Sequence, residues 1–72
     1  MTMNNGIILY TQDGCPQCRM VHMLLDKKGI KYTECKDIEK MKELGINHTP
    51  VLEIAEGTRV IGKAIFDWVN KQ

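Results

Sequence analysis

The chain has 72 residues, of which 43% are hydrophobic and 26% are charged, and its formal net charge is +1. This composition is typical of one small globular domain spanning residues 1–72, and the length leaves no room for a second domain. Ten Lys and Arg balance nine Asp and Glu without a long run of one sign, so we expect neither nucleic acid nor a membrane as a partner.

We expect no targeting signal at the N-terminus. Residues 1–5 lack both the basic region and the apolar region of a signal peptide. No stretch of the chain approaches the roughly 20 consecutive apolar residues of a membrane helix. We therefore expect a cytoplasmic protein, and we expect it to be a monomer.

The first half of the chain predicts a β-α-β unit. Residues 7–11 are β-branched and aromatic and are followed by turn-forming residues, which favours a strand. Residues 16–28 have apolar positions at helical spacing, with Pro16 suited to the first helical position and Gly29 to the position after the helix. Residues 30–35 then favour a second strand. Because it follows the helix so closely, this strand is expected to run parallel to the first through a right-handed crossover.

The second half predicts a short helix, a hairpin and a last helix. Apolar residues recur every third position over residues 38–44, before Gly45. Residues 51–54 and 58–61 are two short strands, and Gly57 suits the tight turn between them. An apolar stripe after Gly62 predicts the third helix, with Trp68 in the core. The order is β-α-β-α-β-β-α, an α/β fold with a four-stranded mixed sheet and three helices.

Cys15 and Cys18 are too close in sequence to form a useful structural crosslink. A disulfide between them closes a loop of about four residues, worth roughly 2 kcal/mol, against roughly 3 kcal/mol for fifteen residues. A Cys-x-x-Cys that follows a strand and opens a helix instead indicates redox chemistry. Cys15 lies where the positive helix end favours a thiolate, so it is the expected nucleophile. Cys18 lies at the border of the apolar stripe and is the expected resolving thiol.

Two segments resemble the glutaredoxin family. Residues 10–18, Tyr-Thr-Gln-Asp-Gly-Cys-Pro-Gln-Cys, are similar to the active-site segment of that family, and residues 48–51, His-Thr-Pro-Val, are similar to its cis-proline loop. The resemblance implies a thioredoxin-like fold and a dithiol–disulfide oxidoreductase with no bound cofactor beyond the redox-active Cys15–Cys18 disulfide. It also implies a cis Thr49–Pro50 bond lining the substrate groove. The other expected substrate-binding residues are Tyr10, Gln17, Gly62 and Lys63.

Two departures from the family pattern concern the electron donor. Gln17 stands where glutaredoxins commonly have an aromatic residue, and residues 62–65, Gly-Lys-Ala-Ile, replace a Gly-Gly pair followed by a polar residue. The usual clamp for the α-amino group of glutathione is therefore missing. The short chain and Gln17 instead resemble the glutaredoxin-like hydrogen donors of ribonucleotide reductase, although their characteristic tail is absent. The expected substrate is a disulfide-containing protein such as ribonucleotide reductase, and the expected reductant is either thioredoxin reductase or glutathione.

A zinc-binding module is the alternative from another class. Cys15, Cys18 and Cys35, together with His22 or His48, supply four ligands of the right type. The second close ligand pair of a typical structural site is missing, however.

The remaining candidates have simpler interpretations. Cys35 is expected to be a small buried residue and His22 a helix-surface residue, while His48 is expected near the site without a catalytic role. Arg19 and Lys63 are the cations nearest the motif and the last glycine, where either can face a carboxylate.

Overall fold

The computed structural model describes residues 6–55 and 57–72. Two sequence expectations, on residues 1–5 and on Glu56 in the hairpin turn, lie outside these ranges. Within them, no helix is both long and apolar enough to cross a membrane.

The elements follow one another in the predicted order. Asp37 is the N-cap residue of the second helix, since its side chain accepts a hydrogen bond from the Lys40 N–H at 3.2 Å. The elements are β1 (Ile8–Tyr10), α1 (Pro16–Lys27), β2 (Thr33–Cys35), α2 (Ile38–Glu43), β3 (Val51–Ala55), β4 (Thr58–Ile61) and α3 (Lys63–Asn70). This confirms a thioredoxin-like α/β fold, and the described residues contain three helices and a four-stranded sheet.

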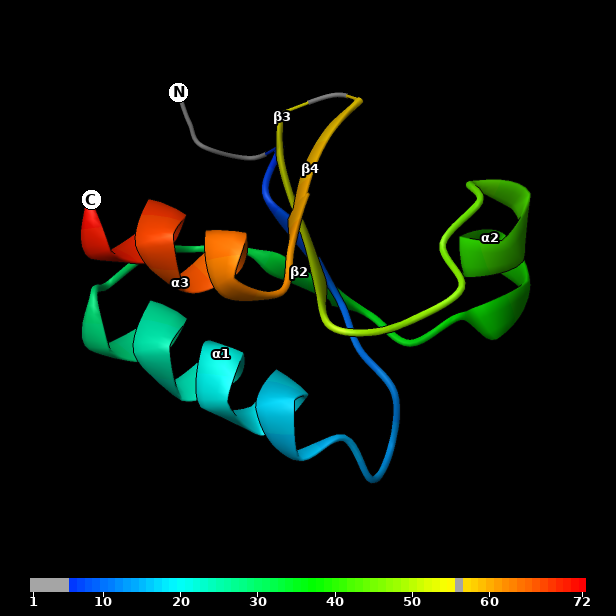
Figure 1. Cartoon of the computed structure of the whole chain (residues 1–72), viewed down its shortest axis with the longest axis horizontal. Coiled ribbons are helices and arrows are strands. Elements are labelled where there is room, and N and C mark those ends of the chain that lie inside the picture. Colours follow the sequence, from blue (N-terminus) through cyan, green and yellow to red (C-terminus); the bar gives the residue numbers. More distant parts are fainter. Residues whose placement is uncertain (1–5, 56) are drawn as a thin grey trace.

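The strands form one mixed sheet in the order β2-β1-β3-β4 (Figure 1). β1 runs parallel to β2, and the β1–β3 and β3–β4 pairs are antiparallel. Tyr10 pairs with Val51, which in turn pairs with Ile61. Thr11 follows Tyr10 in the chain, Pro50 precedes Val51, and Gly62 follows Ile61. These three neighbours therefore lie at the same end of the sheet.

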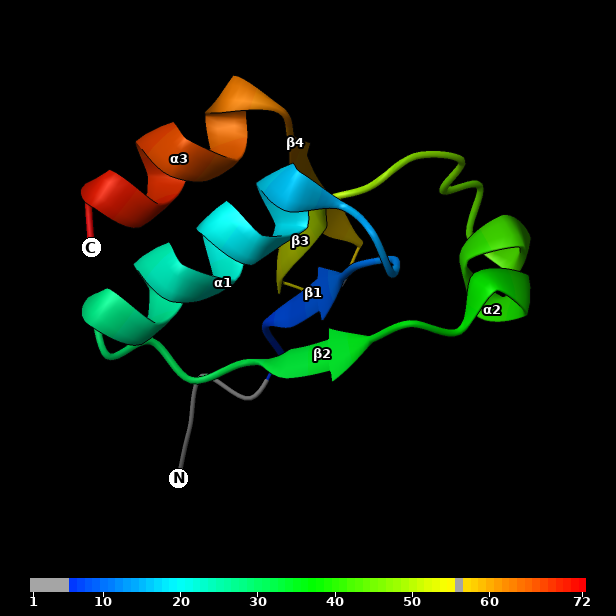
Figure 2. The same cartoon turned by 90° about the horizontal axis from the view of Figure 1, so that it is seen from below.

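Helices α1 and α3 lie side by side on one face of the sheet (Figures 1 and 2). Leu9 from β1 and Leu52 from β3 point toward them and are fully buried. Helix α2 lies beyond the carboxyl ends of β1 and β2, and its Met41 packs with Tyr10 and Val51 on the opposite face of the sheet. The central strands are thus buried on both faces. The larger core cluster consists of Ile7, Leu9, Val21, Leu25, Leu52, Ile65 and Val69.

The second strand is shorter than the sequence predicts. It begins at Thr33 and not at Ile30, because β1 itself begins at Ile8, which pairs with Thr33. Ile30 and Tyr32 precede this pairing and pack against the core without joining the sheet. The Tyr32 hydroxyl instead contacts the ring of His22 on α1.

Candidate active site

A disulfide joins Cys15 and Cys18 at the start of α1, with their Cα atoms 5.3 Å apart. Gly14 has φ +75°, a conformation that suits glycine, and so lets the chain turn from β1 into the helix. Cys15 is the N-cap residue and Pro16 occupies the first turn, where its missing N–H costs no hydrogen bond. The Cys-x-x-Cys motif therefore lies at a strand-to-helix turn, as the sequence predicts.

The two sulfurs have different surroundings. Cys15 is partly buried, whereas Cys18 is only 4% exposed. The Cys15 Sγ atom accepts a hydrogen bond from the Cys18 N–H at 3.1 Å and another from the Thr49 hydroxyl at 3.7 Å. Donors of this kind favour negative charge on an acceptor, so both will stabilise a Cys15 thiolate once the disulfide opens.

The register of the sheet brings Thr49, which precedes Pro50, to the disulfide. Their peptide bond is cis, in agreement with the sequence expectation. Pro50 is buried and directly precedes Val51, the residue that pairs with both Tyr10 and Ile61. Gly62 follows Ile61, so it lies at the same edge of the sheet as Pro50.

Two predicted ligand-binding residues start the last helix. Gly62 is the N-cap residue of α3 and Lys63 is its first residue, and both are exposed. No side chain caps this helix end, and its first turn contains no acidic residue. An anionic group is the only kind of ligand for which this helix end offers charge complementarity.

Tyr10 lies in the core and not at the surface of the site. Its side chain is only 2% exposed and belongs to the cluster beneath α2. Burial, followed by the nearby Glu53, raises the pKa of the Tyr10 hydroxyl above its usual value. The expectation that Tyr10 contacts substrate does not match this placement, because α2 covers the sheet face toward which it points. Gln17 is exposed on the first turn of α1 but does not line the pocket that opens beside the disulfide.

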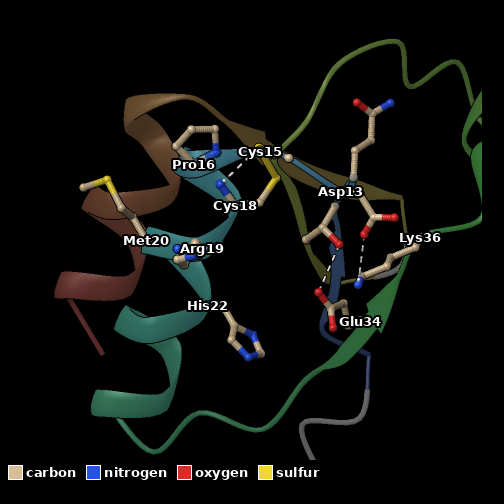
Figure 3. A pocket seen from close by; sticks show the side chains of 12 residues that line it. Asp13, Cys15, Pro16, Cys18, Arg19, Met20, His22, Glu34 and Lys36 are labelled. Carbon is tan, nitrogen blue, oxygen red and sulfur yellow. Dashed lines mark hydrogen bonds and ion pairs between the residues drawn. A yellow bond between two sulfur atoms is a disulfide. The ribbon is translucent and has the colours of Figure 1, made fainter.

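A pocket of about 500 Å³ opens beside the disulfide. Figure 3 shows Cys15 just before α1 and Cys18 and Arg19 on this helix. Glu34 and Lys36 lie across the pocket on the side of β2. Thr49, Pro50, Gly62 and Lys63 do not line it. The predicted substrate-binding residues and this pocket therefore occupy different places around the same disulfide.

Glu34 and Lys36 line the pocket, although no sequence motif singled them out as candidate site residues. Glu34 is the middle residue of β2 and Lys36 directly follows the strand, which pairs in parallel with β1. Parallel pairing brings this end of β2 next to the loop that carries the cysteines. The available signal was the polar character of these residues at the end of the strand predicted over residues 30–35, since the carboxyl ends of parallel strands are common places for binding sites.

The described residues offer no metal site. Nowhere in the ranges 6–55 and 57–72 do three or more His, Cys, Asp or Glu side chains gather closely enough to hold an ion. Cys35 is partly buried against the cluster beneath α2, and His48 is exposed. The zinc alternative therefore has no support from the geometry.

His22 belongs to a separate polar cluster on α1. Its ring contacts the Tyr32 hydroxyl, and its Nε2 atom lies 3.8 Å from a carboxylate oxygen of Asp26. Burial, followed by the charges of Asp26 and Glu34, raises the pKa of Tyr32 to about 12. His22 is thus directed toward Tyr32 and Asp26, which differs from the simple surface residue that the sequence suggested.

A Cys-x-x-Cys disulfide at the first turn of α1, in a thioredoxin-like fold, defines the class of thiol–disulfide oxidoreductases. Residues 7–57 match the glutaredoxin family, and the chain belongs to this family. It is also similar to a protein of Bacillus subtilis (strain 168) named N-acetyl-S-hydroxy-L-cysteine reductase. The two are 29% identical over 64 residues, which cover 79% of this chain and 69% of the relative.

Proposed function

We propose that the protein reduces disulfides by a dithiol mechanism in which Cys15 attacks and Cys18 resolves. The observation that carries this proposal is the difference between the two sulfurs. Cys15 is partly buried and accepts hydrogen bonds from the Cys18 N–H and the Thr49 hydroxyl. Cys18 is 4% exposed, so an incoming substrate meets Cys15 first.

The reaction consists of two exchanges. The Cys15 thiolate attacks one sulfur of the substrate disulfide, whose S–S bond breaks, and the other sulfur leaves as a thiolate and takes up a proton. Cys18 then loses its proton and attacks Cys15 Sγ, which releases the second substrate thiol and forms the Cys15–Cys18 disulfide. Two electrons pass from the protein dithiol to the substrate, and the two thiol protons end on the two products.

The hydrogen bonds to Cys15 assist the first exchange. A stabilised thiolate is more abundant at neutral pH, although its intrinsic nucleophilicity is lower. In the second exchange Cys15 Sγ is the atom that Cys18 attacks and the substrate thiolate is the leaving group, so stabilisation of the Cys15 thiolate acts on the first exchange.

Trapping the mixed disulfide tests the two roles. Cys18→Ser protein treated with a disulfide substrate should accumulate a covalent adduct on Cys15, seen by intact-mass spectrometry and peptide mapping. Cys15→Ser protein should form none at the motif, and Cys35→Ser is the matched control because it changes a cysteine outside the motif. An adduct on Cys18 in the Cys15→Ser protein, with none on Cys15 in the other, would show that the roles are reversed.

We further propose that a flavin-dependent reductase of the thioredoxin reductase type supplies the electrons in preference to glutathione. The support is the start of α3, where Lys63 offers a cation but the first turn has no acidic residue for an ammonium group. A protein disulfide, such as that of ribonucleotide reductase, remains the proposed macromolecular substrate. Oxidation of NADPH by thioredoxin reductase, with and without the protein, measures the donor preference directly.

The name of the relative favours a second substrate chemistry, the reduction of a sulfenic acid. The Cys15 thiolate would attack the sulfenyl sulfur, the S–O bond would break, and hydroxide would leave as water after taking up a proton. Cys18 would then resolve the resulting mixed disulfide as before. Mixing Cys18→Ser protein with freshly generated N-acetylcysteine sulfenic acid tests this, since an N-acetylcysteine adduct on Cys15 is the expected product.

A further inference from the structure

The pocket beside the disulfide carries charged side chains on two opposite walls. Arg19 lies on α1, directly after Cys18, and Glu34 and Lys36 lie across from it at the end of β2 (Figure 3). Cys15 and Cys18 line the same pocket. A small molecule in this space is therefore in contact with charged groups and with the reacting sulfurs at once.

Two of the charged groups neutralise each other. Lys36 Nζ lies 3.4 Å from the Asp13 carboxylate, so the pair adds no net charge to the pocket. Glu34 accepts a hydrogen bond from the Thr11 hydroxyl at 3.0 Å but has no cationic partner among residues 6–55 and 57–72. Within the same ranges, Arg19 takes part in no ion pair.

Among the described residues, the pocket thus presents one cation without an ion-pair partner, Arg19 on α1, and one such anion, Glu34 on β2. Thr11 is only 2% exposed, so its hydrogen bond fixes the Glu34 carboxylate from the core side. His22 also lines the pocket, but its ring is directed toward Tyr32 and Asp26. Opposite charges on facing walls match a ligand that carries both signs.

We infer that this pocket binds the α-carboxylate and α-ammonium of a cysteine whose sulfur reacts with Cys15, so that small cysteine disulfides are substrates. Arg19 receives the carboxylate, for which a guanidinium provides paired donors, and Glu34 receives the ammonium. The inference rests on the proposed disulfide reduction and specifies a class of substrate for it.

The reaction with cystine, the disulfide of two cysteines, balances without an added co-reactant. Cys15 attacks one cystine sulfur, the cystine S–S bond breaks, and one cysteine leaves and takes up a proton. Cys18 then attacks Cys15 Sγ and releases the second cysteine. The two electrons come from the protein dithiol, which ends as the Cys15–Cys18 disulfide, so one turnover of reduced protein needs no further reductant.

The expected preference is modest because both side chains are exposed. Ion pairs at exposed sites contribute about 0.2–1 kcal/mol, which corresponds to a rate ratio of about 1.5- to 5-fold for each contact. Salt screens such contacts, so the preference for cystine should shrink as ionic strength rises.

Single-turnover rates on four disulfides test the inference. Cystine carries both charged groups, cystamine lacks the carboxylates, N,N′-diacetylcystine lacks the ammonium groups, and bis(2-hydroxyethyl) disulfide carries neither. Arg19→Gln should lower the rate on cystine relative to cystamine. Glu34→Gln should lower the rate on cystine relative to diacetylcystine. Each ratio is compared between variant and unaltered protein, so differences between leaving groups cancel.

Two variants outside the pocket control for net charge. Lys27→Gln removes a cation from the same helix, and Glu43→Gln removes an anion from α2, and neither residue lines the pocket. Both should leave the rate ratios unchanged.

The outcomes separate this inference from the proposed function. If reduced protein converts all four disulfides but Arg19→Gln and Glu34→Gln change no ratio, the pocket does not select amino-acid disulfides. If it converts none of them, nor a protein disulfide, the proposed function itself fails.

Discussion

The hydroxyl of Thr49 lies 3.7 Å from the sulfur of Cys15, although 34 positions separate the two residues in the chain. The contact depends on the sheet, because Thr49 is held just before β3, and β3 pairs directly with the strand that leads to Cys15. A side-chain hydroxyl from a distant loop thus supplements the backbone N–H of Cys18 at the reactive sulfur.

Replacing Thr49 with Val should slow the attack by Cys15. The change removes one hydrogen bond and keeps the shape of the side chain. The lost hydrogen bond contributes about 0.5–1.5 kcal/mol to the thiolate, and a Brønsted slope of about 0.45 returns nearly half of this as higher nucleophilicity, so the rate at neutral pH should fall about 1.5- to 4-fold. Alkylation of Cys15 as a function of pH, in a background without Cys18 and Cys35, measures this. Thr58→Val on exposed β4 is the control, and an identical pH profile for both variants would contradict the assignment.

Cys35→Ser should leave disulfide reduction almost unchanged. Cys35 ends β2, where no helix terminus stabilises a thiolate, and it packs partly buried beside Tyr10. Steady-state reduction of a disulfide substrate measures the effect, with circular dichroism to verify the fold. A large loss of activity in a folded Cys35→Ser protein would give this thiol a redox role.

Glutathione should bind the oxidised protein weakly. The start of α3 lacks a partner for the glutathione ammonium, and one missing charged hydrogen bond costs roughly 1.5–3 kcal/mol, or about ten- to a hundredfold in affinity. Ala64→Asp should recover part of this, whereas the neutral, similarly shaped Ala64→Asn should recover much less. NMR titration of both variants is the measurement. Saturable shifts at Lys63 and Thr49 in the unaltered protein at low millimolar glutathione would count against the prediction.

Arg59→Met should destabilise the fold by about 1–3 kcal/mol. Arg59 Nε donates to the Glu53 carboxylate at 3.0 Å, and Nη1 donates to the Leu44 carbonyl at the end of α2. The Glu53 side chain is 12% exposed, so the variant leaves a carboxylate nearly buried without its cation. Urea unfolding gives the loss, and Glu53→Gln in the Arg59→Met background should restore part of it. Equal stability of the variant and the unaltered protein would mean that this ion pair contributes nothing net.

Alkaline pH should weaken the fold through Tyr32. Because its pKa is raised from 10.0 to about 12, the folded state keeps the phenol proton that the unfolded chain releases. The contribution to stability is therefore complete below pH 10 and is lost as the pH rises toward 12. Tyr32→Phe should show a smaller loss over this window, measured by urea unfolding. Absorbance at 295 nm should show one phenol fewer titrating near pH 12, and an unchanged titration curve would refute the assignment.

The parts of the fold that local patterns determine were predictable. The helical spacing after Pro16 and the turn at Gly57 depend on residues that are near one another in sequence. The same holds for the Cys-x-x-Cys at a strand-to-helix turn, whose chemistry comes from the local helix end.

The parts that depend on packing between distant elements were not predictable. The sequence predicts Tyr10 as a strand residue near the Cys-x-x-Cys motif. Only the structure shows that α2 covers its side chain. Glu34 becomes a pocket residue because β2 begins late and pairs with β1 in a particular register. Thr49 is the intermediate case, since the family resemblance placed it near Cys15 but the hydrogen bond required the structure.

The burial of Cys18 gives the exchange of sulfurs a direction. In the proposed mechanism, a substrate sulfur arrives at Cys15 from the solvent side, whereas Cys18, which is 4% exposed, approaches the same atom from within the protein. The departing thiol therefore leaves along the path by which the substrate entered. Neither cysteine belongs to either hydrophobic cluster, so those clusters can stay closed throughout a cycle of bond exchange.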